Sequence, residues 1–178
     1  MRGTWWRQAA SGLDPLELRQ PPGDGRWQRG EVTGATYLAS DEATVWAEWY
    51  RALAERALPP RVWLPCELWR IEVEVEGIAD LSDAERLGAA GLAIPERRRA
   101  TWAPYQAVGE RLHAAGLAGL VAPSAARAEG RVLCLFRGPS VPPGVRTRGR
   151  AHRVAEPPPL RAGCGRSRRV APPAARSV

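Results

Sequence analysis

The 178-residue sequence contains no lysine, only two histidines and only three cysteines. It also lacks an apolar run close to the roughly 20 residues that a membrane-spanning helix needs, and its first residues show no apolar core of an export signal. The cysteines, Cys66, Cys134 and Cys164, are widely spaced and odd in number, which excludes a disulfide framework and favours a reducing compartment. These absences predict a cytoplasmic protein without a membrane anchor.

Motifs for metal ions and for common nucleotide-binding folds are missing as well. His113 and His152 lie in different kinds of segment, and no pair of cysteines or histidines has the short spacing of a zinc site. The glycines of Gly23-Asp24-Gly25 are followed by Arg26-Trp27-Gln28 rather than by the start of a helix. We therefore expect no metal, and neither a P-loop nor a Rossmann phosphate loop.

Positive charge is abundant but unevenly placed. The formal net charge is +7, and every basic side chain other than histidine is an arginine. Residues 141–178 hold nine arginines and a single acid, whereas residues 1–140 hold 17 arginines and 18 acids. The body of the protein is thus nearly neutral, so the net charge by itself does not predict a nucleic-acid-binding domain.

The same boundary separates two kinds of composition. Hydrophobic residues make up 44% of the chain and include eight tryptophans, which is enough for one packed core. Beyond the apolar run that ends at Phe136, the sequence is dominated by Pro, Gly, Arg and Ala, which bury too little apolar surface to offset the entropy of ordering the backbone. We expect one compact domain over residues 1–140 and a disordered, basic, flexible tail over residues 141–178.

Within the domain, the patterns indicate a mixed α/β fold. Strict alternation over Ile71–Glu76 predicts a strand with its glutamates in solvent, and Ser40 followed by two acids predicts the start of a helix. A loop rich in Pro and Gly is expected over residues 16–34. We expect strands at residues 4–9, 35–39, 71–76, 120–122 and 131–136, and helices at residues 41–57, 82–87 and 101–115.

Four short motifs occur in a distinctive order and spacing. They are Gly25-Arg26-Trp27, Tyr37-Leu38-Ala39, Ala47-Glu48 and Pro123-Ser124-Ala125, preceded near the N-terminus by Trp6-Arg7. In this order, together with a strand before the helix that carries the glutamate, the chain resembles the RES-domain family, which is named for an Arg, a Glu and a Ser. The resemblance spans roughly residues 4–137.

The resemblance implies a fold similar to that of the ADP-ribosyltransferase toxins. It also implies cleavage of the nicotinamide–ribose bond of NAD, with transfer of ADP-ribose to phosphate or water, and no cofactor beyond NAD as the substrate. Members of the family are toxins of bacterial toxin–antitoxin pairs, so an antitoxin with a helix-turn-helix DNA-binding portion is an implied partner. Trp102 and Tyr105 either line a nicotinamide or adenine pocket or pack in the core.

Each motif residue then has an expected role. Glu48 stabilises the positive charge that develops on the ribose, and Arg26 together with Arg7 clamps the pyrophosphate. Tyr37 stacks on the nicotinamide or orients the ribose through its hydroxyl. Ser124 donates a hydrogen bond to a phosphate oxygen, either of NAD or of inorganic phosphate. These five residues are expected to converge on one cleft.

The residue patterns alone support a plainer interpretation. On a helix, Glu48 shares a polar side with Thr44, Arg51 and Glu55, which predicts a solvated glutamate. By residue type alone, Arg26 is a surface residue in a loop, Tyr37 is a core residue and Ser124 is a turn residue. Only their joint arrangement favours a site.

Two other functions stay open at this point. The first is a mono-ADP-ribosyltransferase that modifies one target protein, so that the product is a labelled protein. The second is a non-catalytic interaction protein whose arginine-rich tail binds nucleic acid, with binding that weakens as salt is added.

Overall fold

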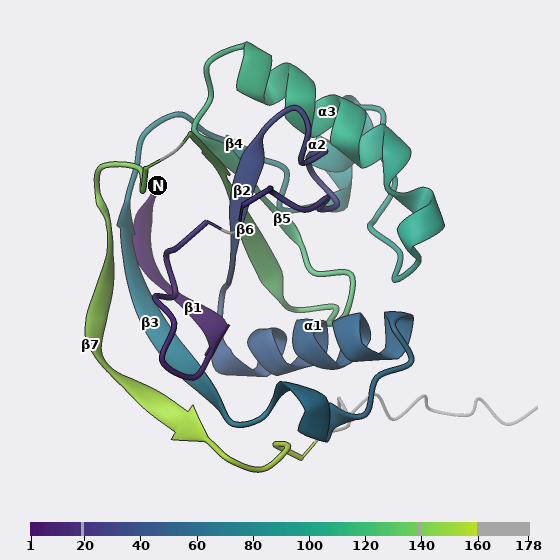
Figure 1. Ribbon diagram of the computed structural model, residues 1–178. Coiled ribbons are helices and arrows are strands. Elements are labelled where there is room, and N and C mark those ends of the chain that lie inside the picture. Colours follow the sequence, from purple (N-terminus) through teal and green to yellow (C-terminus); the bar gives the residue numbers. More distant parts are fainter. Residues whose placement is uncertain (19, 139, 160–178) are drawn as a thin grey trace, which may run out of the picture.

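The computed structural model describes residues 1–18, 20–138 and 140–159 (Figure 1). No helix within these ranges is long and apolar enough to cross a membrane. The strands are β1 (Arg2–Ala10), β2 (Gly34–Ala39), β3 (Cys66–Glu74), β4 (Ile78–Asp80), β5 (Gly119–Pro123), β6 (Arg131–Arg137) and β7 (Val145–Val154). The helices are α1 (Glu42–Glu55), α2 (Ala84–Ala89) and α3 (Ala103–Ala114), with short 3-10 turns at Pro60–Trp63 and Arg99–Thr101.

The strands form one mixed sheet in the order β4-β5-β6-β2-β1-β3-β7. Only β4 and β5 run parallel, and all other neighbours are antiparallel. The joint between β1 and β2 is weak, because the two strands are in register only at Trp6 and Ala39, whereas β1 pairs with β3 along its whole length. The sheet therefore opens into two halves, and β1, β3 and β7 curve away from β2, β5 and β6 (Figure 1).

The first apolar core fills the space between these two halves. Trp5 and Ile71 come from the half with β1 and β3, and Leu38, Leu133 and Leu135 come from the half with β2 and β6. All five are at most 7% exposed. Burial of this apolar surface holds the halves together where backbone pairing between β1 and β2 is sparse.

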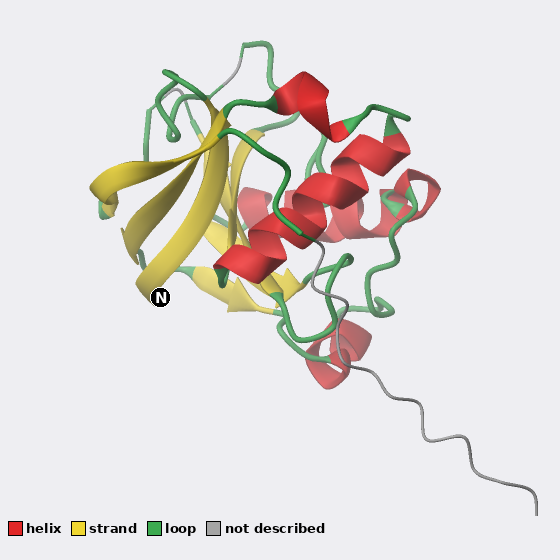
Figure 2. Cartoon of the chain, turned by 90° about the horizontal axis from the view of Figure 1, so that it is seen from below, coloured by secondary structure: helices red, strands yellow, loops and turns green. Residues whose placement is uncertain are grey.

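The helices lie together on one side of the strands (Figure 2). Helix α1 packs its tryptophans, Trp46 and Trp49, in a cluster with Leu68 of β3. Helix α3 packs Tyr105 and Val108 in a second cluster with β5 and β6. Residues of β2 take part in both clusters, so the two helices lie over neighbouring parts of one face.

Helix α1 begins and ends close to the predicted positions, residues 41 and 57. The side chain of Asp41 caps its N-terminus by accepting a hydrogen bond of 2.9 Å from the backbone N–H of Thr44. Glu42 in the first turn favours the positive end of the helix dipole. This helix carries Glu48, so the cap, by fixing the start of the helix, contributes to the position of the Glu48 carboxylate.

The predicted fold class is confirmed, and most expected elements are present. Strand β3 begins at Cys66, five residues before the expected start, and it turns Glu72 and Glu74 away from the buried Ile71 and Val73 as the alternation predicts. The three-residue strand β4 was not expected, because so short an edge strand carries no usable periodicity.

The prediction of a flexible tail from residue 141 onward is wrong for β7. This strand pairs antiparallel with β3, from Val145 opposite Val73 to Val154 opposite Cys66. Most of its side chains are exposed, because an edge strand obtains its order from backbone hydrogen bonds and needs few apolar residues. The domain boundary predicted at residue 140 is therefore too early, and residues 160–178 of the predicted tail lie outside the described residues.

Candidate active site

The polar side of α1 faces the protein rather than solvent, which corrects the plainer interpretation of its periodicity. Thr44 is fully buried. The side chains of Glu48, Arg51 and Glu55 are only 23%, 17% and 22% exposed. These four residues, spaced by four, three and four positions, form a polar stripe along one face of the helix.

Both oxygens of the Glu48 carboxylate are engaged. Ser124 Oγ donates a hydrogen bond of 2.6 Å to Oε1, and Arg51 Nε donates one of 2.7 Å to Oε2. Arg51 also donates through Nη1 to Glu55. A carboxylate held from two sides has a fixed orientation, and each of its oxygens retains a second lone pair for a ligand.

Ser124 follows β5 directly and begins a tight turn. Its Oγ accepts hydrogen bonds from the backbone N–H groups of Ala126 (3.1 Å) and Arg127 (3.2 Å). Its own N–H donates to the carbonyl of Gly130. With both acceptor positions occupied by the turn, the hydroxyl proton is directed to Glu48. Ser124 is thus both the turn residue of the plainer interpretation and a partner of the predicted glutamate.

A second contact joins this turn to the start of α1. Arg127 Nη1 donates hydrogen bonds of 3.0 Å to both carboxylate oxygens of Asp41 and to Thr44 Oγ1. Burial raises the pKa of Asp41, but hydrogen bonds from Thr44 and Ser40 and the charge of Arg127 outweigh it, so the pKa is lowered overall. The cap of α1 and the turn after β5 are therefore held in register.

Gly130 makes this close approach possible. A Cβ atom there would lie 2.5 Å from Thr44 Oγ1 and 2.8 Å from Thr44 Cγ2. Both distances are too short for non-bonded atoms, so the position accepts only glycine without displacing α1 from the turn.

Arg26 is a buried arginine that forms no ion pair with a carboxylate of the described residues. It is 8% exposed, and its Nη2 donates to the backbone carbonyl of Glu96. The guanidinium lies over the rings of Trp102 and Tyr105, 5.8 Å and 5.3 Å from their centroids. Its Nη1 is buried and finds no hydrogen-bond partner among the described residues. A buried guanidinium with an unused donor is suited to an anionic ligand.

The charges of the polar stripe act on Arg26. Burial lowers the pKa of Arg26, and the charge of Arg51 lowers it further, whereas Glu48 and Glu55 act in the opposite direction. The net result is a lowered pKa. The Arg26 guanidinium is therefore affected by both positive and negative charges of α1, and one of these, Glu48, is bonded directly to Ser124.

Tyr37 supports the loop that carries Arg26. Its hydroxyl donates a hydrogen bond of 2.6 Å to Gln28 Oε1 and accepts one of 3.1 Å from the backbone N–H of Trp27. Burial raises the pKa of this phenol well above 10, with Cys134 adding to the effect and Arg26 opposing it. A Cβ at Gly25 would overlap both the Tyr37 hydroxyl and Gln28. In this structure the hydroxyl is bonded to the loop of Arg26.

Arg7 lies on the other face of the sheet. Side chains alternate along β1, so Arg7 shares the face of Trp5, which belongs to the core between the two halves, whereas Trp6 packs with the cluster of α1. Burial and the charge of Arg137 lower the pKa of Arg7 to about 10, and Asp14 opposes them. The structure therefore does not bring Arg7 to Glu48 and Ser124, and its role with the pyrophosphate stays a prediction.

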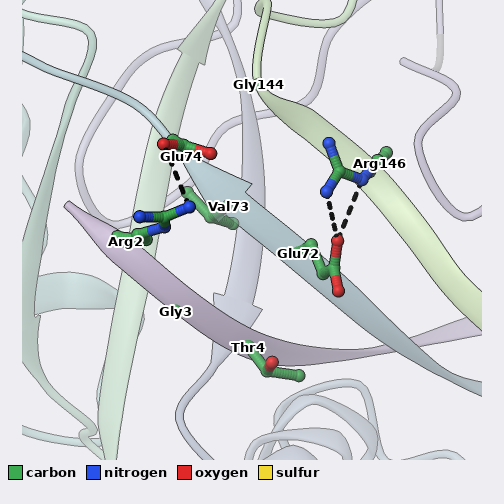
Figure 3. A pocket seen from close by; sticks show the side chains of 8 residues that line it. All are labelled: Arg2, Gly3, Thr4, Glu72, Val73, Glu74, Gly144 and Arg146. Carbon is green, nitrogen blue, oxygen red and sulfur yellow. Dashed lines mark hydrogen bonds and ion pairs between the residues drawn. The ribbon is translucent and has the colours of Figure 1, made fainter.

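Two hollows on the surface lie away from this constellation. One, of about 230 Å³, is on β1, β3 and β7. There Arg2 points to Glu74 and Arg146 to Glu72, at 3.5 Å and 2.6 Å, so the charges are paired with one another (Figure 3). The other, of about 860 Å³, is lined by side chains of α3 and of the loops at Arg29 and Gly91. In the described part of the chain, neither is lined by a predicted site residue.

The family model described as "RES domain" matches residues 4–155. The chain belongs to the RES-domain family. The match extends through β7, in agreement with the later domain boundary. No curated protein matches this RES-domain protein in a sequence search.

Solved structures show the same fold. A chain in the crystal structure of the M. tuberculosis MbcT-MbcA toxin-antitoxin complex superposes with a TM-score of 0.73. The similarity covers 87% of this RES-domain protein and 85% of the other chain, at 22% sequence identity. At this level of identity the likeness concerns the fold.

Three residues that contact the candidate site residues or their supports were not predicted from the sequence as participants. Arg51 was assigned to a solvated face, although its spacing of three and four positions from two glutamates was a usable signal. Arg127 and Gln28 gave no such signal. Their partners, Asp41 and Tyr37, are distant or belong to another element, so only the tertiary structure reveals them.

Proposed function

We propose that this RES-domain protein cleaves the nicotinamide–ribose bond of NAD, transfers ADP-ribose to phosphate or water, and acts as the toxin of a bacterial toxin–antitoxin pair. The observation that carries the proposal is the constellation of an oriented carboxylate, Glu48, bonded to Ser124 and lying within electrostatic reach of Arg26. It is supported by membership of the family and by the fold shared with a chain of a toxin-antitoxin complex.

Glu48 supplies the negative charge that the reaction requires. When the bond between the ribose C1′ and the nicotinamide nitrogen breaks, its electron pair passes to the nicotinamide and the ribose becomes an oxocarbenium-like cation. A fixed carboxylate stabilises that cation without reorganisation, either directly or through the ribose hydroxyls. An oxygen of phosphate or water then forms the new bond to C1′, and water releases its proton to solvent.

Arg26 supplies the positive charge for the pyrophosphate. Its unpartnered Nη1 is a donor already removed from water, so pairing with a phosphate oxygen adds a hydrogen bond without a further desolvation cost to that atom. The rings of Trp102 and Tyr105 hold the guanidinium plane in place. Ser124 and Tyr37 orient the two charged groups, Ser124 through its hydrogen bond to Glu48 and Tyr37 through its support of the loop that carries Arg26. NAD is the only small molecule needed besides the acceptor, and no metal takes part.

One assay tests this function and separates it from its alternatives. Purified protein is incubated with NAD, with and without phosphate and with EDTA, and nicotinamide release is followed together with the fate of ADP-ribose. We expect release that persists in EDTA and is lost in Glu48→Gln and Arg26→Ala. Free ADP-ribose or its phosphorylated form identifies the acceptor, whereas labelled protein identifies a mono-ADP-ribosyltransferase. A folded wild-type protein that consumes no NAD under any condition would sink the proposal.

The proposed partner is an antitoxin with a helix-turn-helix DNA-binding portion, and the proposed place of action is the cytoplasm, where the NAD pool is available. The test is co-expression with the product of the neighbouring gene. We expect a co-purifying complex that releases no nicotinamide until the partner is removed. Full activity in a stable complex would contradict inhibition by that partner.

A further inference from the structure

Arg51 stands between two glutamates of its own helix. Its Nε donates a hydrogen bond of 2.7 Å to Oε2 of Glu48, three residues before it. Its Nη1 donates a hydrogen bond to Glu55, four residues after it. Burial lowers the pKa of Arg51, but the two glutamates outweigh this effect and raise it overall. The guanidinium is thus charged and bonded at both ends.

Pairs at these spacings often stabilise only the helix that carries them. Here the surroundings differ from those of a solvated pair, because all three side chains are less than one quarter exposed. A comparison within the chain is Arg86 on α2, which pairs with Asp83 at 2.7 Å while both side chains are about half exposed. The Arg86 pair contacts no candidate site residue, whereas Arg51 bonds directly to the carboxylate of Glu48.

We propose that Arg51, anchored by Glu55, is a positioning residue that fixes the carboxylate of Glu48 for reaction at the ribose. This inference rests on the proposed NAD cleavage. Ser124 holds one carboxylate oxygen from the turn after β5, and Arg51 holds the other from within α1. Without Arg51, the glutamate retains one contact and rotates about its side-chain bonds, so its charge is no longer held where the cation forms.

Arg51 also contributes to the charge of the site, and this second effect must be separated from positioning. Arg26 and Arg51 together balance Glu48 and Glu55, so the four groups are formally neutral. Loss of Arg51 leaves an excess negative charge, which weakens the binding of an anionic dinucleotide. Loss of Glu55 in the same protein restores neutrality but leaves the clamp on Glu48 absent.

The experiment compares Arg51→Gln, the double variant Arg51→Gln/Glu55→Gln and Arg51→Lys with wild type, by kcat and KM for NAD. We expect Arg51→Gln to lower kcat by roughly 10- to 100-fold and to raise KM. In the double variant KM returns toward the wild-type value, whereas kcat stays low. Lysine restores the charge but cannot bond at both ends, so it rescues kcat only in part. Arg86→Gln is the matched control and should leave both constants unchanged.

Each other outcome overturns the inference. If the double variant regains the wild-type kcat, Arg51 acts through charge alone. If every variant keeps the wild-type kcat while thermal unfolding shows a less stable protein, Arg51 only stabilises α1. The failure of the proposed function is distinct, because it appears in wild type as the absence of NAD consumption. Unfolding midpoints measured for all variants ensure that rates are compared between folded proteins.

Discussion

The hydroxyl of Ser124 donates a hydrogen bond of 2.6 Å to Oε1 of Glu48, across 76 positions of the sequence. Together with the bond from Arg127 to Thr44, it joins the turn after β5 to the polar stripe of α1. Because the same oxygen of Ser124 accepts two backbone N–H groups, the geometry of the turn determines the direction of this bond.

Glu48→Gln should reduce nicotinamide release by at least about 100-fold, because removal of a fixed charge next to a developing cation costs several kcal/mol of barrier stabilisation. The amide has nearly the same size and still accepts a hydrogen bond from Ser124, so the fold should persist. The measurement is the initial rate of nicotinamide release. Glu85→Gln, on the exposed side of α2, is the control for a glutamate outside the site. A Glu48→Gln protein as fast as wild type contradicts the assigned role.

Ser124→Ala should lower both stability and rate. The substitution leaves the N–H groups of Ala126 and Arg127 without their acceptor, which costs roughly 1–3 kcal/mol in unfolding free energy. Glu48 also loses one of its two restraints, so kcat should fall by about tenfold. Urea unfolding and rate measurements check the two effects separately. Ser11 is the control, because it is exposed and its hydroxyl donates a hydrogen bond to Glu67. Ser11→Ala should change the unfolding free energy by no more than about 0.5 kcal/mol.

Arg26→Lys should weaken the binding of NAD or ADP-ribose by roughly tenfold, even though the charge is retained. A lysine lacks the planar group that lies over Trp102 and Tyr105 and cannot pair with phosphate through two donors. Titration with NAD or ADP-ribose, followed by calorimetry, measures the loss. The exposed Arg61 is a suitable control for the same exchange. Unaltered affinity in Arg26→Lys places the pyrophosphate elsewhere.

Gly130→Ala and Gly88→Ala should have opposite effects. The methyl group at position 130 would meet Thr44 at 2.5 Å and 2.8 Å, which separates the turn from α1 and destabilises the protein by more than about 1 kcal/mol. Position 88 lies within α2 and has open space, so alanine should stabilise it by roughly 0.5–1 kcal/mol. Thermal unfolding of both variants is the measurement. Equal shifts in the two proteins would contradict the close approach at Gly130.

Alkaline pH should destabilise the protein through Cys134. Burial raises the pKa of this thiol from 9.0 to about 12, with the Tyr37 hydroxyl opposing the shift. A group whose pKa is raised by folding contributes stability below its unfolded pKa and loses that contribution as pH rises toward the folded one. The unfolding free energy should therefore decline between about pH 9 and pH 12, and Cys134→Ala should flatten part of this slope. An identical slope in the variant assigns the decline to other groups.

Much of the fold follows from local patterns. The alternation over β3, the cap at Asp41 and the glycine-rich loop before β2 each specify an element or a break on their own. Strand β7 could not be found in this way. Its side chains are mostly exposed and four of its ten residues are arginines, and its order comes from hydrogen bonds to β3, a partner more than 70 residues away in the sequence.

For the site, the motifs identified Arg26, Glu48 and Ser124 as a group; the structure joins Glu48 to Ser124 by a hydrogen bond, and the charge of Glu48 acts on Arg26. The group is predictable because the motifs are defined by residue type and by order and spacing along the chain, although they lie on different elements: a loop at Arg26, α1 at Glu48 and the turn after β5 at Ser124. Motif order and spacing did not predict the face of the sheet on which Arg7 lies. Side chains alternate along β1, and the register with its neighbouring strands decides which of them point to which face of the sheet.

By itself, then, the sequence determined the elements, the family resemblance and the candidates Arg26, Glu48 and Ser124, because these depend on residue type and short-range spacing. Only the tertiary structure decided that the polar stripe of α1 is turned inward. A helix specifies which side chains share a face, but not which face meets the rest of the protein. That choice is made by the packing of Trp46 and Trp49 and by the contacts of Ser124 and Arg127, which come from distant parts of the chain.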